Sequence, residues 1–308
     1  MVRDDQDRLA DDVGATPSVA TQDFPPPSCT VQVSFGAQSR RGRSREVNED
    51  HYVVIRLSRH QSTLLSSLPE DAIWKEFDEY GYAMVVADGV GTAGAGESAS
   101  RLAITTLVHL VRHFGKWNLR VDHTIAQEIM ERAEMIYRHV DSTVVHESLT
   151  GPISGLQTTL TATFGAGRDM FFAHVGHSRA YLFREGVLMR LTRDHAIGRS
   201  QSTTVPVAPL VDVNTTARDL KHILTNTIGM RGSTGPKIDL ERFRLADKDV
   251  VLVCTNGLTD ALDENAISDV LAAHESPDHE CRELVDRAIA AGAEDDVTAL
   301  VAEYQIPN

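Results

Sequence analysis

Alternating and continuous apolar runs along the chain predict many short strands. Residues 30–39 and 50–57 alternate apolar and polar positions, as half-buried strands do. Residues 80–88 form a continuous apolar run that stops abruptly at Asp88 and Gly89, which predicts a buried strand. The same kinds of pattern predict later strands at residues 160–166, 170–176, 179–186, 187–192, 249–257 and 296–304.

Helical segments interrupt these strands in two places. Residues 96–114 carry an apolar stripe at helical spacing, and a second helix is expected to begin after Asp122, its predicted N-cap. Two later helices are expected near Asp263 and at Ser276, where serine can cap and the following proline fits the first turn. Many strands interrupted by two helical hairpins predict an α+β sandwich with helices outside the sheets.

The N-terminal segment and one internal stretch differ in composition from the rest of the chain. Residues 1–28 are polar and end in three consecutive prolines and a serine, which predicts a disordered tail ahead of one domain at 29–308. Residues 196–222 are rich in Ser, Thr, Val and Pro without periodicity, which predicts an irregular flap.

Charge and composition narrow the class of protein. The net charge is −14 over 308 residues, with no Lys/Arg-rich block, so neither nucleic acid nor an anionic membrane is an expected partner. No run approaches the roughly 18 apolar residues that a membrane span needs. The first residues are acidic rather than signal-like, so a cytoplasmic protein is expected. The three cysteines are dispersed and are expected to be reduced thiols.

Candidate chemistry gathers where apolar strands begin or end. The strand-end polar residues are Glu49 and Asp50, Asp88, Asp295 and Asp296, and Asn256 within Thr255-Asn256-Gly257. Carboxylates that converge at one end of a sheet repel one another, and divalent cations such as Mg²⁺ or Mn²⁺ relieve that repulsion. Gly89 and Gly257 are expected to let the backbone turn sharply there. A single strand-end Asp is more often a turn former or helix cap, so spacing alone leaves the metal and the reaction open.

Segments around these residues resemble the PPM family, the protein phosphatase 2C type of metal-dependent serine/threonine phosphatase, in its bacterial form. The resemblance covers roughly residues 31–305, with matching segments in the family's order at residues 43–50, 85–100, 155–164, 175–186, 191–198, 251–262 and 294–301. It implies a β-sandwich of two mainly antiparallel sheets flanked by antiparallel helix pairs, in four α-β-β-α layers. It also implies two Mn²⁺ or Mg²⁺ ions and a phosphorylated protein substrate, a target of a serine/threonine kinase.

The resemblance also implies roles for individual residues. Asp88 should bridge both metals, with the carbonyl of Gly89 on one of them and Asp295 on the second. Glu49 and Asp50 should contact the centre directly or through water. Arg45 matches the phosphate-binding arginine, whose guanidinium fork suits the oxygens of the transferred group. The implied reaction is in-line attack on phosphorus by a water shared between the metals.

Three positions depart from the family pattern. Asn256 stands where an aspartate ligand is usual, which leads to the hypothesis that the second metal binds more weakly. His177 stands where many relatives have an aspartate of a third metal site, so that site is lost or altered, or His177 merely hydrogen-bonds nearby. Ala93 replaces a histidine. These departures leave an alternative open: a catalytically weak or inactive module that binds a kinase or phosphoprotein.

Other residues in the matching segments are expected to support the fold. Cys254 is expected to be a packed apolar residue, and Thr158 and Thr159 are expected to be packing residues. Arg179 is expected to make a supporting hydrogen bond or ion pair, and Asp194 is expected to order the start of the flap.

Overall fold

The computed structural model describes residues 30–69, 72–73, 75–91, 94–114, 121–197, 223–232 and 234–307. The predicted tail at 1–28, most of the predicted flap at 196–222 and Ala93 lie outside these described residues.

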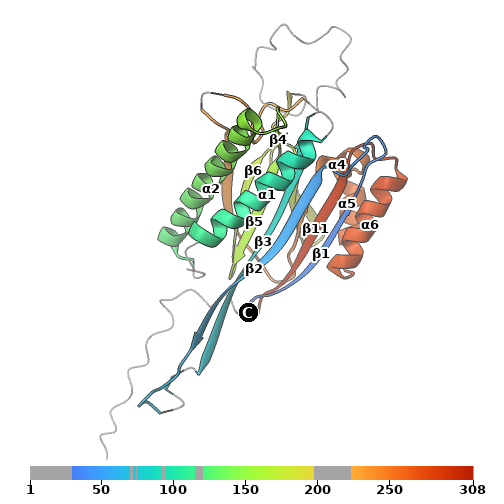
Figure 1. The fold of residues 1–308 in the computed structure, drawn as a ribbon. Coiled ribbons are helices and arrows are strands. Elements are labelled where there is room, and N and C mark those ends of the chain that lie inside the picture. Colours follow the sequence, from blue (N-terminus) through green and yellow to red (C-terminus); the bar gives the residue numbers. More distant parts are fainter. Residues whose placement is uncertain are drawn as a thin grey trace, which may run out of the picture.

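Two antiparallel sheets make up the centre of the molecule (Figure 1). Five strands form the first sheet, in the order β1 (Gln32–Arg40), β11 (Val297–Gln305), β10 (Val250–Cys254), β7 (Arg179–Arg184) and β8 (Val187–Arg190). The second sheet has the order β2 (Asp50–Ser62), β3 (Glu76–Val90), β5 (Leu160–Ala166), β6 (Asp169–Val175) and β9 (Asp239–Arg244), with β4 (Gln157–Thr158) paired to β3. The predicted sandwich of antiparallel sheets is confirmed.

Helices cover the outer face of each sheet, as predicted (Figure 1). The second sheet is covered by α1 (Ala95–Phe114) and α2 (His123–Thr150), and the first by α4 (Asn256–Ala261), α5 (Glu264–Leu271) and α6 (Pro277–Ala290). The two predicted N-caps, Asp122 and Ser276, are confirmed, because each accepts a backbone N–H from the first turn, and Asp263 caps the helix that was expected to begin near it. Within the described residues, no helix is long and apolar enough to cross a membrane.

Three elements were not predicted from the sequence, and one of them, β4 (Gln157–Thr158), has only two residues. The strand β9 reads Asp-Leu-Glu-Arg-Phe-Arg, with too many charges to show the alternation of a half-buried strand. The helix α4 has only six residues, and its N-cap Thr255 makes no side-chain capping bond, so it lacks both usual helix signals.

Strand periodicity explains how one strand serves two apolar layers. Along β11, Val297, Ala299 and Val301 pack against the helices of the first sheet, whereas Leu300 and Ala302 pack between the two sheets. Successive side chains of a strand point to opposite faces, so both faces of β11 are buried and its apolar run is continuous. The central layer therefore joins the two sheets into one sandwich.

The register of this sandwich brings the strand-end residues together. Asp50 lies opposite Asp88 on the neighbouring strands β2 and β3. On the other sheet, Asp295 lies two residues before the start of β11, and Asn256 lies two residues after the end of β10. The hydroxyl Oγ1 of Thr255 lies 2.8 Å from Asp50 Oδ2, so the two sheets meet at this end of the molecule.

Candidate metal centre

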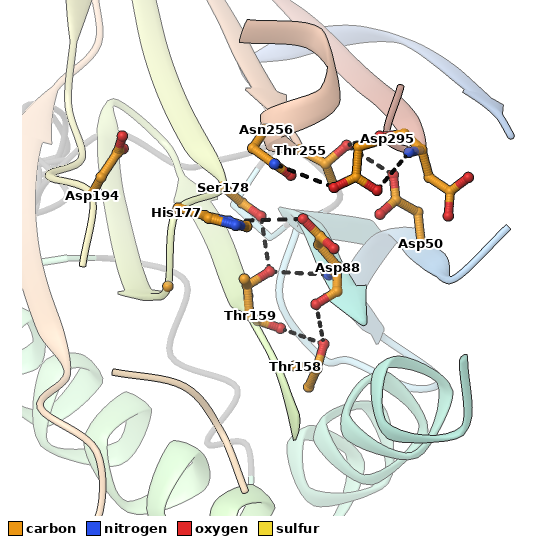
Figure 2. Close-up of polar contacts among 12 residues, drawn as sticks. Asp50, Asp88, Thr158, Thr159, His177, Ser178, Asp194, Thr255, Asn256 and Asp295 are labelled. Carbon is orange, nitrogen blue, oxygen red and sulfur yellow. Dashed lines mark hydrogen bonds and ion pairs between the residues drawn. The ribbon is translucent and has the colours of Figure 1, made fainter. Parts of the chain in front are cut away.

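The Asp50 and Asp88 pair forms the floor of the candidate site. The two residues are 6% and 4% exposed, respectively. The backbone of Asp88 is fixed on both sides: its N–H donates to Thr159 Oγ1 at 3.0 Å, and its carbonyl accepts from Thr158 Oγ1 at 2.8 Å. Both threonines are fully buried, as expected of packing residues, and both also hold Asp88 through hydrogen bonds (Figure 2).

Asp50 is oriented from the opposite sheet. Its Oδ2 accepts hydrogen bonds from Thr298 Oγ1 at 2.7 Å and Thr255 Oγ1 at 2.8 Å. Burial raises the pKa of Asp50 to about 7, because the two threonine hydrogen bonds offset only part of the desolvation. The nearby carboxylates of Asp296 and Asp295 raise this pKa further.

Three oxygen atoms at this end of the sandwich have no hydrogen-bond partner among the described residues. They are Asp50 Oδ1, Asp88 Oδ2 and Asn256 Oδ1, and all three are buried. Burial, and then the charge of Asp50, holds the pKa of Asp88 well above its usual range. Unsatisfied buried acceptors are costly, about 1–3 kcal/mol each, so three in one place need an explanation. A bound cation would supply one.

His177 and Asn256 face the same space as Asp88 and Asp295 (Figure 2). His177 Nδ1 lies 3.8 Å from Asp88 Oδ2. The amide Nδ2 of Asn256 lies 3.4 Å from Asp295 Oδ2 and 3.4 Å from Asp260 Oδ2. Because the amide donors point to carboxylates, Oδ1 of Asn256 is left as the acceptor.

Arg45 joins the remaining acids. Its Nε donates to Asp295 Oδ1 at 2.7 Å, and its Nη1 donates to Glu49 Oε2 at 3.0 Å. The hydrogen bond to Asp295 raises the pKa of Arg45 further above its usual value. The Arg45 side chain is 30% exposed and lines a cavity of about 400 Å³ together with Asp260 and Asp295. A substrate entering this cavity would therefore meet the guanidinium.

Asp296 has a different role from its neighbour Asp295. Its two oxygens accept the backbone N–H groups of Gly42 at 2.8 Å and Glu49 at 2.7 Å. Asp296 thus fixes the loop that carries Arg45 and Glu49 to the start of β11. The strand-end pattern placed the two aspartates together, and only the family resemblance singled out Asp295. Their separate roles could have been predicted, because adjacent residues entering a strand point in opposite directions.

Gly89 and Gly257 allow close approach of backbones rather than sharp turns. Neither has a positive φ, so the predicted turning role is wrong. A Cβ at Gly89 would lie 2.2 Å from backbone atoms of Gly96 at the start of α1, and one at Gly257 would lie 2.1 Å from the carbonyl of Asp296. Only glycine lets α1 and α4 begin this close to the site.

Two supporting residues behave as expected. Arg179 donates from Nε and Nη2 to the two oxygens of Asp194, at 3.1 and 2.9 Å. In Figure 2, Asp194 lies apart from the cluster around Asp88. Cys254 is fully buried on β10, and burial raises its pKa to about 12, which suits a packing residue.

The donor set fits hard divalent cations that keep most of their water. Within the described part of the chain, no three His, Cys, Asp or Glu side chains form a ready cage for one ion. Arg45 donates to one oxygen each of Glu49 and Asp295, and two threonines donate to one oxygen of Asp50. Each of these carboxylates therefore has one oxygen that these bonds leave for a cation. Mg²⁺ typically binds proteins through one or two carboxylates and retains several waters, and Mn²⁺ also suits oxygen ligands.

Comparison with known proteins identifies the family. The family model of protein phosphatase 2C matches residues 66–290, so the chain belongs to the protein phosphatase 2C family. This confirms the resemblance and the enzyme class predicted from the motifs.

Two bacterial phosphatases illustrate the similarity. The serine/threonine phosphatase stp of Listeria monocytogenes is 26% identical over 226 residues, which cover 72% of this chain and 84% of that one. The serine/threonine protein phosphatase PstP of Mycobacterium tuberculosis is 28% identical over 281 residues, or 89% of this chain. The match covers only 45% of PstP, so this chain spans about half the length of that relative.

Solved structures share the fold. The catalytic domain of PstP in complex with two manganese ions superposes with a TM-score of 0.64 at 24% identity, covering 89% of this chain and 99% of that one. The phosphatase Stp1 from Staphylococcus aureus gives a TM-score of 0.67 at 21% identity, covering 88% and 95%. These similarities confirm the α+β sandwich with its flanking helices.

Proposed function

We propose that this protein hydrolyses phosphoserine and phosphothreonine in a phosphorylated protein, a target of a serine/threonine kinase, at a binuclear Mn²⁺ or Mg²⁺ centre. The observation that carries the proposal is the set of three buried acceptor oxygens without partners, on Asp50, Asp88 and Asn256. The manganese ions in the PstP catalytic domain support the same cofactor here.

In this proposal, Asp88 and Asp50 would hold the ions from one sheet, and Asp295 and Asn256 from the other. Gly89 would contribute its carbonyl, and Glu49 would act directly or through water. When bound, the two ions would lower the pKa of an attacking water and neutralise charge on the phosphoryl oxygens. The threonine bonds would hold the backbone of Asp88 and the carboxylate of Asp50 in place while that charge develops.

Arg45 would bind the substrate phosphate. A guanidinium has five N–H donors, and the bonds to Asp295 and Glu49 use two of them. The donors that remain can reach phosphoryl oxygens from the wall of the 400 Å³ cavity. The same two carboxylates hold the guanidinium plane, so Arg45 need not be ordered when substrate arrives.

Two substitutions tune this centre. Asn256 offers a neutral oxygen where a carboxylate would add charge, so the second ion should bind more weakly. His177 places an imidazole 3.8 Å from Asp88, and we propose that it replaces a third, carboxylate-based metal site. The cytoplasmic location stays a prediction from the sequence.

The proposal is tested by hydrolysis of a phosphothreonine peptide across separate Mn²⁺ and Mg²⁺ titrations. We expect turnover that requires the metal and is lost in Asp88→Asn, a variant of nearly unchanged shape. Turnover in EDTA equal to that with metal would contradict the metal role. A folded wild-type protein without turnover at any metal concentration would instead favour the noncatalytic binding module.

A further inference from the structure

A cavity of about 160 Å³ lies between the α1–α2 hairpin and the second sheet, away from the metal centre. Its floor is formed by side chains of β2, β3, β5 and β6, and its roof by side chains of α1 and α2. Both walls are apolar; the floor includes Ile55, Ala162 and Phe171, and the roof includes Leu107, Met130 and Ala133. The space lies between two layers of the fold and opens to solvent on one side.

The layers around this cavity are not closely packed. Interiors of native proteins are normally filled to crystal-like density, and voids larger than a water molecule are few. Here Ile129, Ile136 and Ala162, which belong to the apolar clusters between helix and sheet, are only partly buried. Apolar surface that could be covered is left accessible at this place.

The lining offers almost nothing to a polar ligand. Among the described residues, Arg132 is the only charged one that lines the cavity, and its Nη2 donates to Glu128 at 3.0 Å. The hydroxyl of Tyr137 is satisfied by the carbonyl of Ala173 at 2.8 Å. The lining itself therefore offers water few hydrogen-bond partners, and an apolar cavity of about 150 Å³ engineered in another protein binds benzene.

We propose that this cavity is a binding site for a small uncharged hydrophobic molecule, of the size of one substituted aromatic ring or a short hydrocarbon chain. A volume of about 160 Å³ suits one small molecule and is too small for a docked helix or strand. Discrimination should follow polarity rather than shape, because a buried hydroxyl would have no partner there. The site is independent of the metal centre and of the proposed reaction.

Methyl NMR with toluene as the probe tests this directly. The chain has 7 methionines, of which Met130 lines the cavity and Met189 lies on β8 in the other sheet. In protein labelled with ¹³C at methionine methyls, we expect toluene to shift the Met130 signal saturably and to leave Met189 unchanged. Phenol, of similar shape, should bind at least about tenfold more weakly. Absence of a saturable Met130 shift, or equal shifts at both methionines, would overturn the proposal.

A cavity-filling variant provides the second test. Toluene should raise the unfolding midpoint of the wild type by about 2 °C. Ala133→Leu adds bulk to the roof of the cavity, at a helix position that tolerates leucine well, and should abolish this rise. Ser142→Leu adds similar bulk at an exposed position of the same helix and should keep that rise. Equal rises in both variants would contradict the site. The NMR test decides the matter if Ala133→Leu does not fold.

Discussion

Asp88 and Asp194 are both buried aspartates beside a strand end, but their surroundings differ. The two oxygens of Asp194 accept hydrogen bonds from Arg179, and Arg190 adds a further ion pair. Oδ2 of Asp88 accepts no hydrogen bond, and His177 is 3.8 Å away. The oxygens of Asp194 are therefore satisfied by two arginines, whereas burial raises the pKa of Asp88 well above its usual range.

This difference separates a structural carboxylate from a candidate ligand. Burial alone does not distinguish them, since both are less than 10% exposed. What distinguishes them is whether the protein itself satisfies the oxygens. A buried carboxylate whose oxygens lack protein donors can bind an external cation. A carboxylate whose oxygens are all hydrogen-bonded by the protein stabilises the fold instead.

The largest expected effect is on activity in Asp88→Asn. We expect hydrolysis of a phosphothreonine peptide at saturating Mn²⁺ to fall by about 10³-fold or more, because the carboxylate proposed to hold the ions is lost. The free energy of unfolding in EDTA should change by less than about 1 kcal/mol, since Oδ2 of Asp88 accepts no hydrogen bond from the described residues. A large loss of stability would show that Asp88, like Asp194, is a structural carboxylate, and would contradict its assignment as a metal ligand.

Asp194→Asn should show the reverse pattern. Removing one partner of a buried ion pair leaves Arg179 uncompensated, which typically costs about 3 kcal/mol or more. Urea unfolding in EDTA measures this loss. Mn²⁺ affinity should stay within about twofold of the wild type, because Asp194 lies apart from the cluster around Asp88 (Figure 2) and distant substitutions act independently. Loss of Mn²⁺ binding without loss of stability would show that Asp194 serves the metal centre.

Glu280 sharpens the comparison, because it is an incompletely satisfied carboxylate on α6, outside the centre. Its Oε2 is buried without a hydrogen bond, and burial, with help from Glu303 and Glu275, raises its pKa to about 7. Because the carboxylate pKa is raised in the folded protein, the unfolded chain loses this proton at a lower pH than the folded protein does. Stability should therefore fall as pH rises from about 4.3, the unfolded pKa, to about 7, and stay low above that.

Glu280→Gln should remove this loss. We expect the variant to match the wild type near pH 4 and to be more stable by about 1–2 kcal/mol at pH 8, as measured by urea unfolding. Equal stability at both pH values would mean that Glu280 has a partner in solution that completes its carboxylate.

The smallest expected effect is on metal affinity in Asn256→Asp. The change adds a charged oxygen where Asn256 Oδ1 has no partner and replaces amide contacts of 3.4 Å to Asp295 and Asp260. We expect the Mn²⁺ concentration for half-maximal activity to fall by about tenfold, which corresponds to about 1.4 kcal/mol. Asn256→Ala, which removes the oxygen, should raise it. An unchanged requirement in both variants would remove Asn256 from the centre.

Local patterns predicted most of the fold. The alternation in residues 30–39 and the caps at Asp122 and Ser276 depend on neighbours in sequence, so these elements were found correctly. Strand β9 and helix α4 were missed because tertiary packing, rather than local pattern, holds them in place. The order of strands in each sheet is likewise a long-range property.

The candidate site was predicted as a set of residues but not as a geometry. Strand-end positions and the family resemblance singled out Asp88, Asp50 and Asp295. The separate role of Asp296 and the hydrogen bonds from Thr298 required knowledge of which strands are neighbours. Gly89 shows the same limit, because its need for glycine comes from α1 and not from its own φ.

Calorimetric titration of Mn²⁺ into metal-free protein tests the central claim most directly, that incomplete oxygens at the strand ends form a binuclear centre. The wild type should bind about two ions per chain, the weaker one strengthened in Asn256→Asp. Asp88→Asn should lose both, and Asp194→Asn should retain both. Equal Mn²⁺ binding by the wild type and a folded Asp88→Asn would contradict the account.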